Sequence, residues 1–377
     1  MKMSKKLKLT MLGTIITRRI SSAFYKYLEV GKGLDHPFDL MLREIFDLEV
    51  IYYDSRLSYD ISPYKVYVID FLKIFPTYFK KLMKSDIIIT PGYGAVFEFL
   101  LAYIVSKIRK NLLIVKDTHW YWHQTKISRF FWFIYFSLLR KVPLVIVPGR
   151  AAYIFWRSYG FENIRIVHYY WLESWMPKCL NTSSSLLYLR SKYDFIILYL
   201  GRLIKKRGID IAIKAFSNLL KESNINSVFV IAGDGPIKDE LISLSKQLSI
   251  SDRIIFLGPV PEKYKECLYD IADIFVYVPI IEKIPEEWPI PPLESMKKGV
   301  PTIISTAVGS LLDLIPGVLV VKWGSVEHLS NLMKELALNE EERDRVSKLA
   351  LKIANSINEK EVLLELIKAV RECIAGK

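Results

Sequence analysis

Short, continuously apolar runs alternate with longer stretches of helical periodicity through the first half of the chain. Runs of this kind are typical of strands that are covered on both faces of a parallel sheet. The stretches between the runs are long enough to form helices, so the pattern predicts a series of βαβ units. We expect strands at residues 7–13, 48–54, 64–70, 86–90, 112–117 and 143–148.

A serine run in residues 180–194 interrupts this pattern, and we place a linker there. The alternation then restarts, which predicts a second set of βαβ units. The strands expected in it are 195–201, 227–233, 254–258, 274–279 and 301–305. The helices expected between them are 209–222, 237–248, 262–271 and 292–298.

The sequence therefore predicts an α/β protein with two Rossmann-like, doubly wound domains. We assign residues 1–180 to the N-terminal domain and 190–355 to the C-terminal domain. An amphipathic helix at 356–377 follows, and it could pack back on the N-terminal domain. Ligands of such sheets bind beyond the carboxyl ends of the strands, so we look for functional residues in the loops that follow strands.

Composition supports a globular protein, since 51% of the 377 residues are hydrophobic and 25% are charged. The longest uncharged apolar run, residues 130–139, has about half the length that a bilayer requires. We find no secretory signal at the start of the chain. Three widely spaced cysteines, Cys179, Cys267 and Cys373, fit a reducing compartment and no metal cluster. We therefore expect a cytoplasmic protein.

The net charge of +13 lies entirely in the N-terminal half. Residues 1–180 carry 27 Lys and Arg against 14 Asp and Glu, whereas residues 181–377 carry 26 of each kind. A basic half attracts a phosphate-bearing partner, which could be a nucleic acid, an anionic lipid surface or a charged substrate. Nucleic acid is disfavoured because the chain has no recognition helix and no RNA-binding signature.

Residues 72–84 combine aromatic and basic side chains in the pattern of a segment that lies on a membrane surface. The side chains concerned are Phe75, Phe79, Lys80, Lys81 and Lys84. Aromatic rings of such a segment enter the headgroup region, and its lysines are attracted to anionic lipids. The pattern favours peripheral attachment to the cytoplasmic membrane face and would suit a lipid-linked acceptor.

The loop after the strand at 195–201 is basic. Gly201 lets the chain turn and lets a ligand approach the backbone. Arg202 and Arg207 could each donate two charge-assisted hydrogen bonds to phosphate oxygens. The alternative is an ordinary loop between a strand and a helix, with its charges in solvent.

Two carboxylates, Glu286 and Glu294, enclose the stiff stretch EEWPIPPLE. Pro291 and Pro292 suit the start of a helix, which would place Glu294 in its first turn beside N–H groups that favour an anion. Glu294 could then accept the hydroxyls of a ribose, and Glu286 could reach a sugar at the other end of the same ligand. As alternatives, Glu294 could complement the helix dipole and Glu286 could be surface charge.

The spacing of the two carboxylates resembles the E-x7-E signature of retaining glycosyltransferases with the GT-B fold. The residues that fit this frame are Glu286, Trp288, Pro289, Pro291, Glu294, Ser295, Met296, Gly299 and Pro301. The motifs LYLGRLIKKRGIDIAIKAF, VIAGDGP, IIFLGPV and ADIFVYVP stand in the expected order. Residues 195–325 are thus similar to the donor domain of glycosyltransferase family 4, whereas the N-terminal half resembles the family only in its pattern of elements.

The resemblance implies a GT-B fold, a nucleotide diphosphate sugar as donor, and a glycan, lipid or protein as acceptor. It implies no cofactor, and no acidic pair in the sequence suggests a metal site. The donor-binding residues that it implies are Gly201, Arg202, Arg207, Gly235, Val260, Glu286, Pro291 and Glu294. The catalytic residues that it implies are Glu286, Arg202, Arg207 and His119, the last from the loop after the strand at 112–117. The imidazole of His119 could hold a sugar hydroxyl or stabilise charge in the transition state.

The sequence departs from the family pattern at four places. Arg207 replaces the usual lysine, and Pro289 replaces a glycine whose N–H could have served the ligand. The glycine pair after the first strand is reduced to Gly13, and residues 167–171 replace the usual PNG motif. These differences fall at positions that face the sugar and the acceptor in the family.

Three functions remain compatible with the residues. The first is a retaining glycosyltransferase. The second is a nucleotide-sugar epimerase or a phosphorylase on the same architecture, which would transfer no sugar to an acceptor or would require inorganic phosphate. The third is a basic nucleic-acid-binding protein, whose affinity for DNA would rise as salt falls and would be indifferent to nucleotide sugars.

Overall fold

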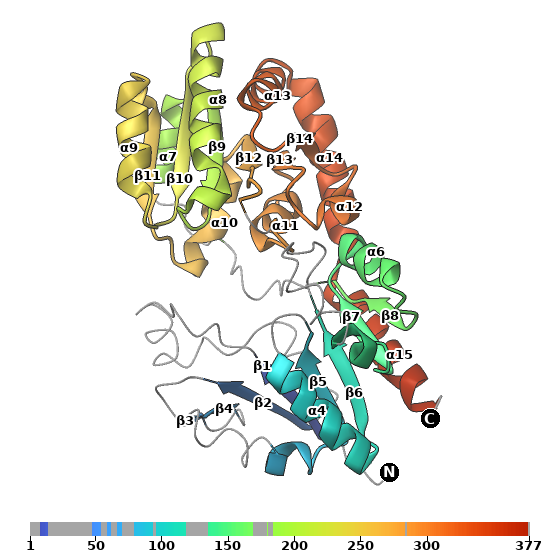
Figure 1. The fold of residues 1–377 in the computed structure, drawn as a ribbon. Helices are drawn as coiled ribbons and strands as arrows, with labels where there is room; N and C mark the ends of the chain where they lie inside the picture. The colour runs from blue at the N-terminus through green and yellow to red at the C-terminus, as the bar shows by residue number, and fades with distance from the viewer. Residues whose placement is uncertain are drawn as a thin grey trace. The chain divides into compact units, whose positions relative to one another are not determined.

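The chain forms two compact units (Figure 1). A computed structural model describes residues 8–13, 47–53, 59–61, 66–69, 79–92, 96–117, 135–168, 179, 184–282 and 285–375. Unit 1 comprises Met1–Pro148, Ala152–Tyr170 and Lys360–Lys377, and unit 2 comprises Gly149–Ala151 and Trp171–Glu359. Each unit contains one sheet.

The sheet of unit 1 has eight strands in the order β3-β4-β2-β1-β5-β6-β7-β8. They are β1 Lys8–Gly13, β2 Asp47–Tyr53, β3 Tyr59–Ile61, β4 Val66–Ile69, β5 Ile87–Pro91, β6 Leu112–Lys116, β7 Leu144–Val147 and β8 Ile164–Ile166. Every pair is parallel except β3 with β4. Strand order extends outward in both directions from β1, as a doubly wound sheet requires.

The helices that accompany this sheet include α4 Val96–Arg109, α6 Arg150–Ser158 and α15 Glu359–Ala375. The core beneath them is aromatic, since the ring of Trp156 lies 4.7 Å from Phe161 and 5.6 Å from Phe136. The last helix, α15, contributes to unit 1 through an ion pair of 2.8 Å between Glu372 and Arg165. Unit 1 therefore combines both ends of the chain.

The sheet of unit 2 has six parallel strands in the order β11-β10-β9-β12-β13-β14. They are β9 Phe195–Leu200, β10 Ser227–Ala232, β11 Ile254–Gly258, β12 Ile274–Tyr277, β13 Thr302–Ser305 and β14 Leu319–Val321. Strands β9 and β10 are buried along their whole length, which explains why they read as continuous apolar runs.

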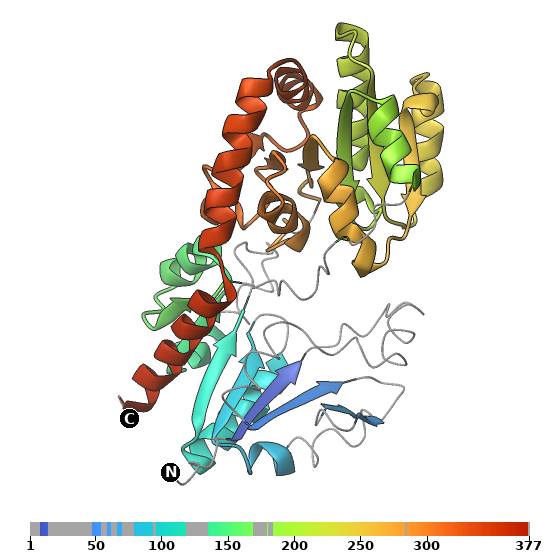
Figure 2. The ribbon, with the colours of Figure 1, turned by 180° about the vertical axis from the view of Figure 1, so that it is seen from behind.

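Helices cover both faces of this sheet. The helices α8 Ile209–Glu222 and α9 Lys238–Gln247 lie on the face seen in Figure 1, and α7 Ser184–Lys192 and α10 Glu262–Ile271 lie on the face seen in Figure 2. The remaining helices are α11 Ile290–Lys297, α12 Leu311–Leu314, α13 Val326–Leu338 and α14 Glu340–Ser356. The two doubly wound sheets expected from the apolar pattern are thus confirmed.

The structure corrects some local expectations. The expected linker contains helix α7, because the residues after the serine run bury Leu189 and pack against α10. The strands β3, β8 and β14 were not predicted, since three residues are too few to produce a recognisable pattern. None of these differences changes the order of the sheets.

Candidate functional site

The loops that follow β9 and β10 in unit 2 approach each other at backbone distance. A Cβ atom on Gly233, which has φ of 145°, would lie 1.8 Å from the carbonyl oxygen of Gly201. A Cβ atom on Gly235 would lie 2.2 Å from the carbonyl oxygen of Leu203. Only glycine allows these approaches. The glycines therefore hold the two loops together, which is a packing role that Gly235 has independently of any ligand.

A third glycine places the basic loop against the residues that follow β12. Gly208 adopts φ of 65° at the end of the 3-10 helix Lys205–Arg207, and a Cβ atom there would lie 2.1 Å from the carbonyl oxygen of Val278. The N–H of Ile280 donates to the carbonyl oxygen of Lys206 over 2.9 Å. This loop is thereby fixed at the carboxyl edge of the sheet.

Glu286 is held at the same edge by the residues that follow β13. Its N–H donates to Ala307 over 2.9 Å, and its carbonyl oxygen accepts from Gly309 over 2.8 Å. Its carboxylate lies 2.9 Å from Nη1 of Arg207 and 3.1 Å from Nζ of Lys206, and 15% of its side chain is exposed. The structure therefore brings Glu286 and Arg207 together and adds Lys206, which the sequence did not single out.

Aromatic rings lie against Arg207. Its guanidinium carbon lies 5.1 Å from the ring centre of Tyr277, which in turn is parallel to the ring of Tyr199 at 6.4 Å. The Tyr199 hydroxyl donates to the carbonyl oxygen of Arg202 over 3.0 Å. Burial raises the pKa of Tyr199, although the charge of Arg207 opposes this, so Tyr199 stays a neutral hydrogen-bond donor at physiological pH.

Arg207 also carries a buried donor. Its Nε is buried, and no residue in the described part of the chain accepts its hydrogen. A buried N–H without a partner is costly. An anionic ligand that accepted this hydrogen would therefore bind favourably. Arg202 is exposed at the same loop. Of the expected phosphate contacts, Arg207 thus belongs to a packed site and Arg202 to its surface.

Glu294 has different surroundings, because it is only 2% exposed. The hydroxyl of Tyr269 donates to its Oε2 over 2.8 Å, and Nζ of Lys265 lies 3.8 Å from its Oε1. Both partners belong to α10. The carboxylate of Glu294 is therefore held by a neighbouring helix.

Helix α11 begins earlier than predicted. Its first residue is Ile290, so Glu294 lies in the second turn and the expectation of a first-turn position is wrong. Pro291 and Pro292 occupy the first turn and carry no N–H. Two of the donors that a helix N-terminus usually presents to an anion are thus missing. The remaining residue expected at the donor site is Val260, which is half-buried in the loop that follows β11.

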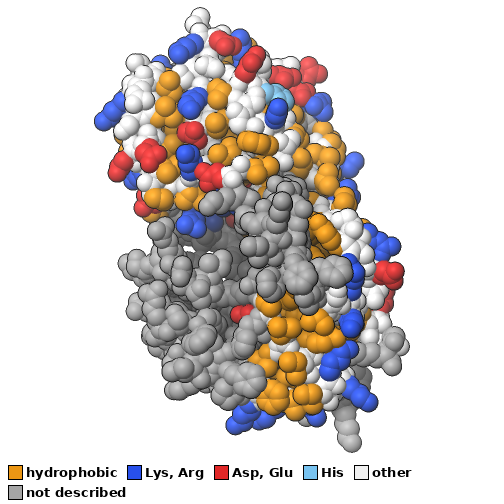
Figure 3. Space-filling view, in the orientation of Figure 1, with side chains coloured by type: hydrophobic (Ala, Val, Ile, Leu, Met, Phe, Trp, Pro, Cys, Tyr) orange, Lys and Arg blue, Asp and Glu red, His pale blue; other side chains and the backbone are white. Residues whose placement is uncertain are grey.

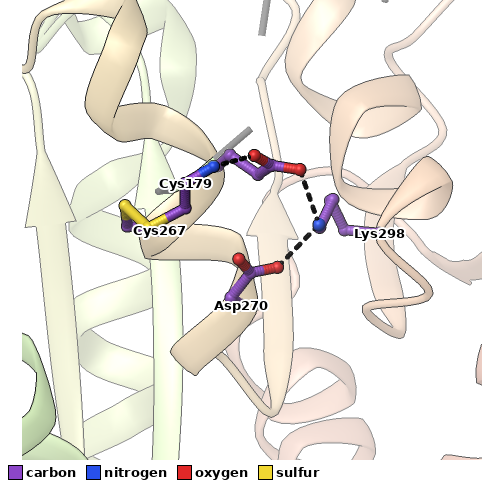
Figure 4. The surroundings of a disulfide bond; sticks show 5 residues. Cys179, Cys267, Asp270 and Lys298 are labelled. Atoms are coloured by element: carbon purple, nitrogen blue, oxygen red, sulfur yellow. Dashed lines mark hydrogen bonds and ion pairs between the residues drawn. A yellow bond between two sulfur atoms is a disulfide. The ribbon is translucent and has the colours of Figure 1, made fainter. Parts of the chain in front are cut away.

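The cysteines correct another expectation, since Cys179 and Cys267 form a disulfide (Figure 4). Cys267 lies on α10, and the N–H of Cys179 donates to the carboxylate of Glu266. Their separation of 88 residues left no spacing signal in the sequence. Cys373 is a free thiol.

A lysine completes the surroundings of this disulfide. Nζ of Lys298 lies 2.8 Å from both Glu266 and Asp270 (Figure 4). Burial opposes the charge of Lys298, but hydrogen bonds to Asp270 and Glu266 outweigh it and raise its pKa. Because Lys298 directly follows the last residue of α11, these contacts and those of Glu294 join α10 to the second turn and the C-terminal end of α11.

Several expectations fall outside this description. His119 and Phe75 lie outside the described residues. In the described part of the chain, no cluster of His, Cys, Asp and Glu could hold a metal ion. No described helix has both the length and the apolar character needed to cross a bilayer.

The match to a family model decides which class of protein contains this site. Residues 188–352 match the model described as glycosyl transferases group 1. These residues belong to the group 1 glycosyltransferase family. The match contains the loop of Arg207, the loop of Glu286 and helices α10 and α11. The candidate site of unit 2 therefore lies within the matched segment.

Curated relatives agree with this assignment. An uncharacterized glycosyltransferase of Methanocaldococcus jannaschii is 36% identical over 120 residues, which are 32% of this chain and 29% of that protein. The alpha-monoglucosyldiacylglycerol synthase of Streptococcus pneumoniae is 31% identical over 107 residues, which are 28% of this chain and 23% of that protein. The chain thus spans less than a third of the length of either relative.

Solved structures extend the likeness to both units. HepE of Anabaena in complex with UDP has a TM-score of 0.73 at 15% identity, over 97% of this chain and 100% of that one. A glycosyltransferase of Rickettsia africae has a TM-score of 0.73 at 14% identity, over 99% and 100%. At these identities the likeness shows the fold alone. The chain therefore has the expected GT-B fold.

Proposed function

We propose that the protein is a retaining glycosyltransferase that moves a sugar from a nucleoside diphosphate sugar to an acceptor. The observation that carries the proposal is the carboxylate of Glu286, held at 2.9 Å from Arg207 and 3.1 Å from Lys206 at the carboxyl edge of a group 1 sheet. HepE, which shares the fold, has been solved with UDP and with UDP-glucose. A site with two cations and one carboxylate suits a ligand that joins a diphosphate to a sugar.

In this function the bond between the anomeric carbon and the diphosphate oxygen breaks, and a bond to the acceptor oxygen forms on the same face. The acceptor proton passes to the departing diphosphate. Arg202 and Arg207 stabilise the negative charge that grows on the diphosphate, which accelerates the reaction because the charge is greatest in the transition state. Protein cations thereby supply the charge that a metal ion provides elsewhere, so we expect transfer without a metal or cofactor.

The other residues orient the donor. Glu286 accepts hydrogen bonds from hydroxyls of the transferred sugar. The resemblance to the family assigns His119, which lies outside the described residues, a role at the same sugar. Glu294 accepts from the ribose. The backbones of Gly201, Gly235, Val260 and Pro291 line the donor.

The acceptor is a lipid-linked or other hydrophobic molecule, and the enzyme works peripherally at a membrane surface. Two relatives support this class of acceptor. One is named a glucosyldiacylglycerol synthase, and another, from Campylobacter jejuni, is named for an undecaprenol-linked glycan. The excess of Lys and Arg in residues 1–180 would attract that membrane.

The test replaces Arg207 by alanine and compares the change in catalytic efficiency with the change in affinity for the bare nucleoside. Catalytic efficiency with the diphosphate donor should fall by at least about 100-fold, the scale of one lost transition-state contact. Affinity for the nucleoside without phosphates should change little. Arg345→Ala, which removes an exposed arginine of α14, is the matched control. Equal losses with donor and nucleoside would show that Arg207 only supports the loop.

A further inference from the structure

A pocket lies in unit 1, at the edge of the sheet opposite to the carboxyl ends of its strands. Its volume is about 600 Å³, and it is lined by the end of α4 and by residues just before β6 and β7. The side chains that matter here are Tyr103, Lys107, Lys110, Asn111, Lys141 and Pro143. We name this the lysine pocket. Donor ligands bind at the other edge of such sheets, so the proposed transfer reaction does not account for it.

The charge of the lysine pocket has one sign. Three lysines line it, and no acidic side chain does so among the described residues. Lys107 lies over the ring of Tyr103, with 5.2 Å between Nζ and the ring centre. Two of the lysines could serve only to complement the C-terminal dipole of α4. Lys141 comes from a different segment, however, so the dipole of α4 does not explain its place in the same pocket.

Helix α4 also exposes an apolar strip. Val96, Ile104 and Ile108 are 43%, 52% and 58% exposed, and together with half-buried Leu100 they repeat at intervals of four residues. Residues four apart lie on one face of a helix, so the four side chains form a continuous row, which we name the α4 strip. Figure 3 shows hydrophobic side chains gathered over the part of unit 1 where α4 lies, with Lys and Arg side chains below them and to their right.

The α4 strip and the lysine pocket adjoin. Lys107 follows Ile104 by three residues and therefore lies on the same side of the helix. An apolar row beside clustered lysines is the combination that binds an anionic membrane surface, where the row enters the acyl boundary and the lysines meet the phosphates. A nucleic acid would engage the lysines but would leave the apolar row in water.

We propose that the lysine pocket binds the phosphate of an anionic phospholipid headgroup while the α4 strip enters the bilayer surface. This deepens the membrane part of the proposed function and rests on it. It assigns attachment to α4 and Lys141, which lie outside the aromatic–basic stretch 72–84. The headgroup is held at one edge of the unit 1 sheet, and the other edge stays open for the acceptor.

The test is co-sedimentation with vesicles of phosphatidylglycerol and of phosphatidylcholine. The wild type should sediment with the anionic vesicles only. Lys107→Ala/Lys141→Ala should weaken this binding by roughly 30-fold, at about 5-fold for each lysine near an anionic surface. Lys221→Ala/Lys246→Ala removes the same charge from exposed positions of unit 2 and should change binding by less than about 2-fold. Ile104→Ser/Ile108→Ser should weaken it even at low salt.

Each other outcome overturns the proposal. It fails if the wild type stays in the supernatant, or if the pocket variant sediments as well as the unit 2 control. Displacement from vesicles by millimolar inorganic phosphate, with retention of the α4 strip variant on vesicles, would show a site for free phosphate. Binding of UDP by unit 2 is measured on the same samples. Normal UDP binding with no vesicle binding would reject the lipid site and leave the proposed transfer reaction intact.

Discussion

Glu286 and Glu294 belong to one short stretch of sequence, yet the protein gives their carboxylates opposite surroundings. Glu286 faces two cations from the loop after β9, and 15% of its side chain is exposed. Glu294 is buried, with 3% of its side chain exposed, and it receives a hydrogen bond from a tyrosine of α10. One carboxylate lies at the edge of the sheet, and the other joins two helices.

This difference distinguishes a carboxylate that a ligand can reach from one that holds two helices together. The ion pairs of Glu286 retain some exposure, with 15% of the Glu286 side chain, 19% of Arg207 and 30% of Lys206 accessible, so a ligand can reach them and exchange with them. The carboxylate of Glu294 lost its hydration on folding and depends on its partners. Changes at Glu286 should therefore alter activity, and changes at Glu294 and its partners should alter stability as well.

The largest effect is expected for Glu286→Gln. The substitution keeps the shape of the side chain but leaves Lys206 and Arg207 without their anion and weakens the hydrogen bonds to the sugar. We expect catalytic efficiency to fall by about 1,000-fold, or about 4 kcal/mol in the transition state. Steady-state kinetics with a nucleotide sugar measures this.

The control for this variant is thermal unfolding. The melting temperature should stay within about 2 °C of wild type, because the pair is partly solvated. Glu282→Gln, which neutralises an exposed acid of the preceding loop, should preserve both activity and stability. A large drop in the melting temperature of Glu286→Gln would break the contrast between the two carboxylates.

Removal of the disulfide tests the structural part of this contrast. Cys267 lies on α10 together with Tyr269, which donates a hydrogen bond to Glu294. Cys179→Ser/Cys267→Ser releases a loop closed over 88 residues. We expect a loss of about 3 kcal/mol in the free energy of unfolding, chiefly because the unfolded chain gains freedom. Denaturant unfolding of the variant and of wild type, each with and without reductant, measures this loss. An unchanged unfolding midpoint would show that α10 is held by its other contacts.

Much of the fold could be predicted from the sequence where burial imposes a simple pattern. Fully buried strands such as β9 and β10 read as apolar runs, and α8 and α10 begin and end at the predicted residues. Helix α7 could not be predicted, because its few buried residues follow a serine run that is typical of a loop.

The sequence singled out individual residues of the candidate site but did not predict the contacts between them. The frame of motifs identified Glu286 and Arg207, whereas Lys206 was one of several similar lysines in the chain. Its pairing with Glu286 depends on how the segment after β12 meets the loop after β9, which no local pattern encodes. The same holds for Cys179 and Cys267, since only the fold brings them together.

Glu294→Gln should have an intermediate effect. The amide keeps an acceptor for Tyr269 but removes the charge beside Lys265, so we expect a loss of about 2 kcal/mol in nucleoside diphosphate affinity. Isothermal titration with UDP measures the change. The melting temperature should also fall, in contrast to Glu286→Gln. Unchanged affinity would contradict the ribose-binding role of Glu294 and leave it a purely structural residue.

The smallest effect is expected for Tyr269→Phe, which removes only the hydroxyl that donates to Glu294 over 2.8 Å. Tyr269 is fully buried, so its ring should keep its place against Phe275 while the carboxylate loses one donor. The free energy of unfolding should fall by about 1 kcal/mol, the usual contribution of one hydrogen bond. Catalytic efficiency should change by less than about 5-fold, because the hydroxyl acts on the ligand indirectly, chiefly through Glu294 and more weakly through the carbonyl oxygen of Pro291 at 3.4 Å. Denaturant unfolding and steady-state kinetics on one preparation test both statements, and Tyr264→Phe on the exposed side of α10 is the control. If Tyr269→Phe lowered activity as strongly as Glu286→Gln, the carboxylate of Glu294 would be as important to the reaction as that of Glu286, and the division between them would be wrong.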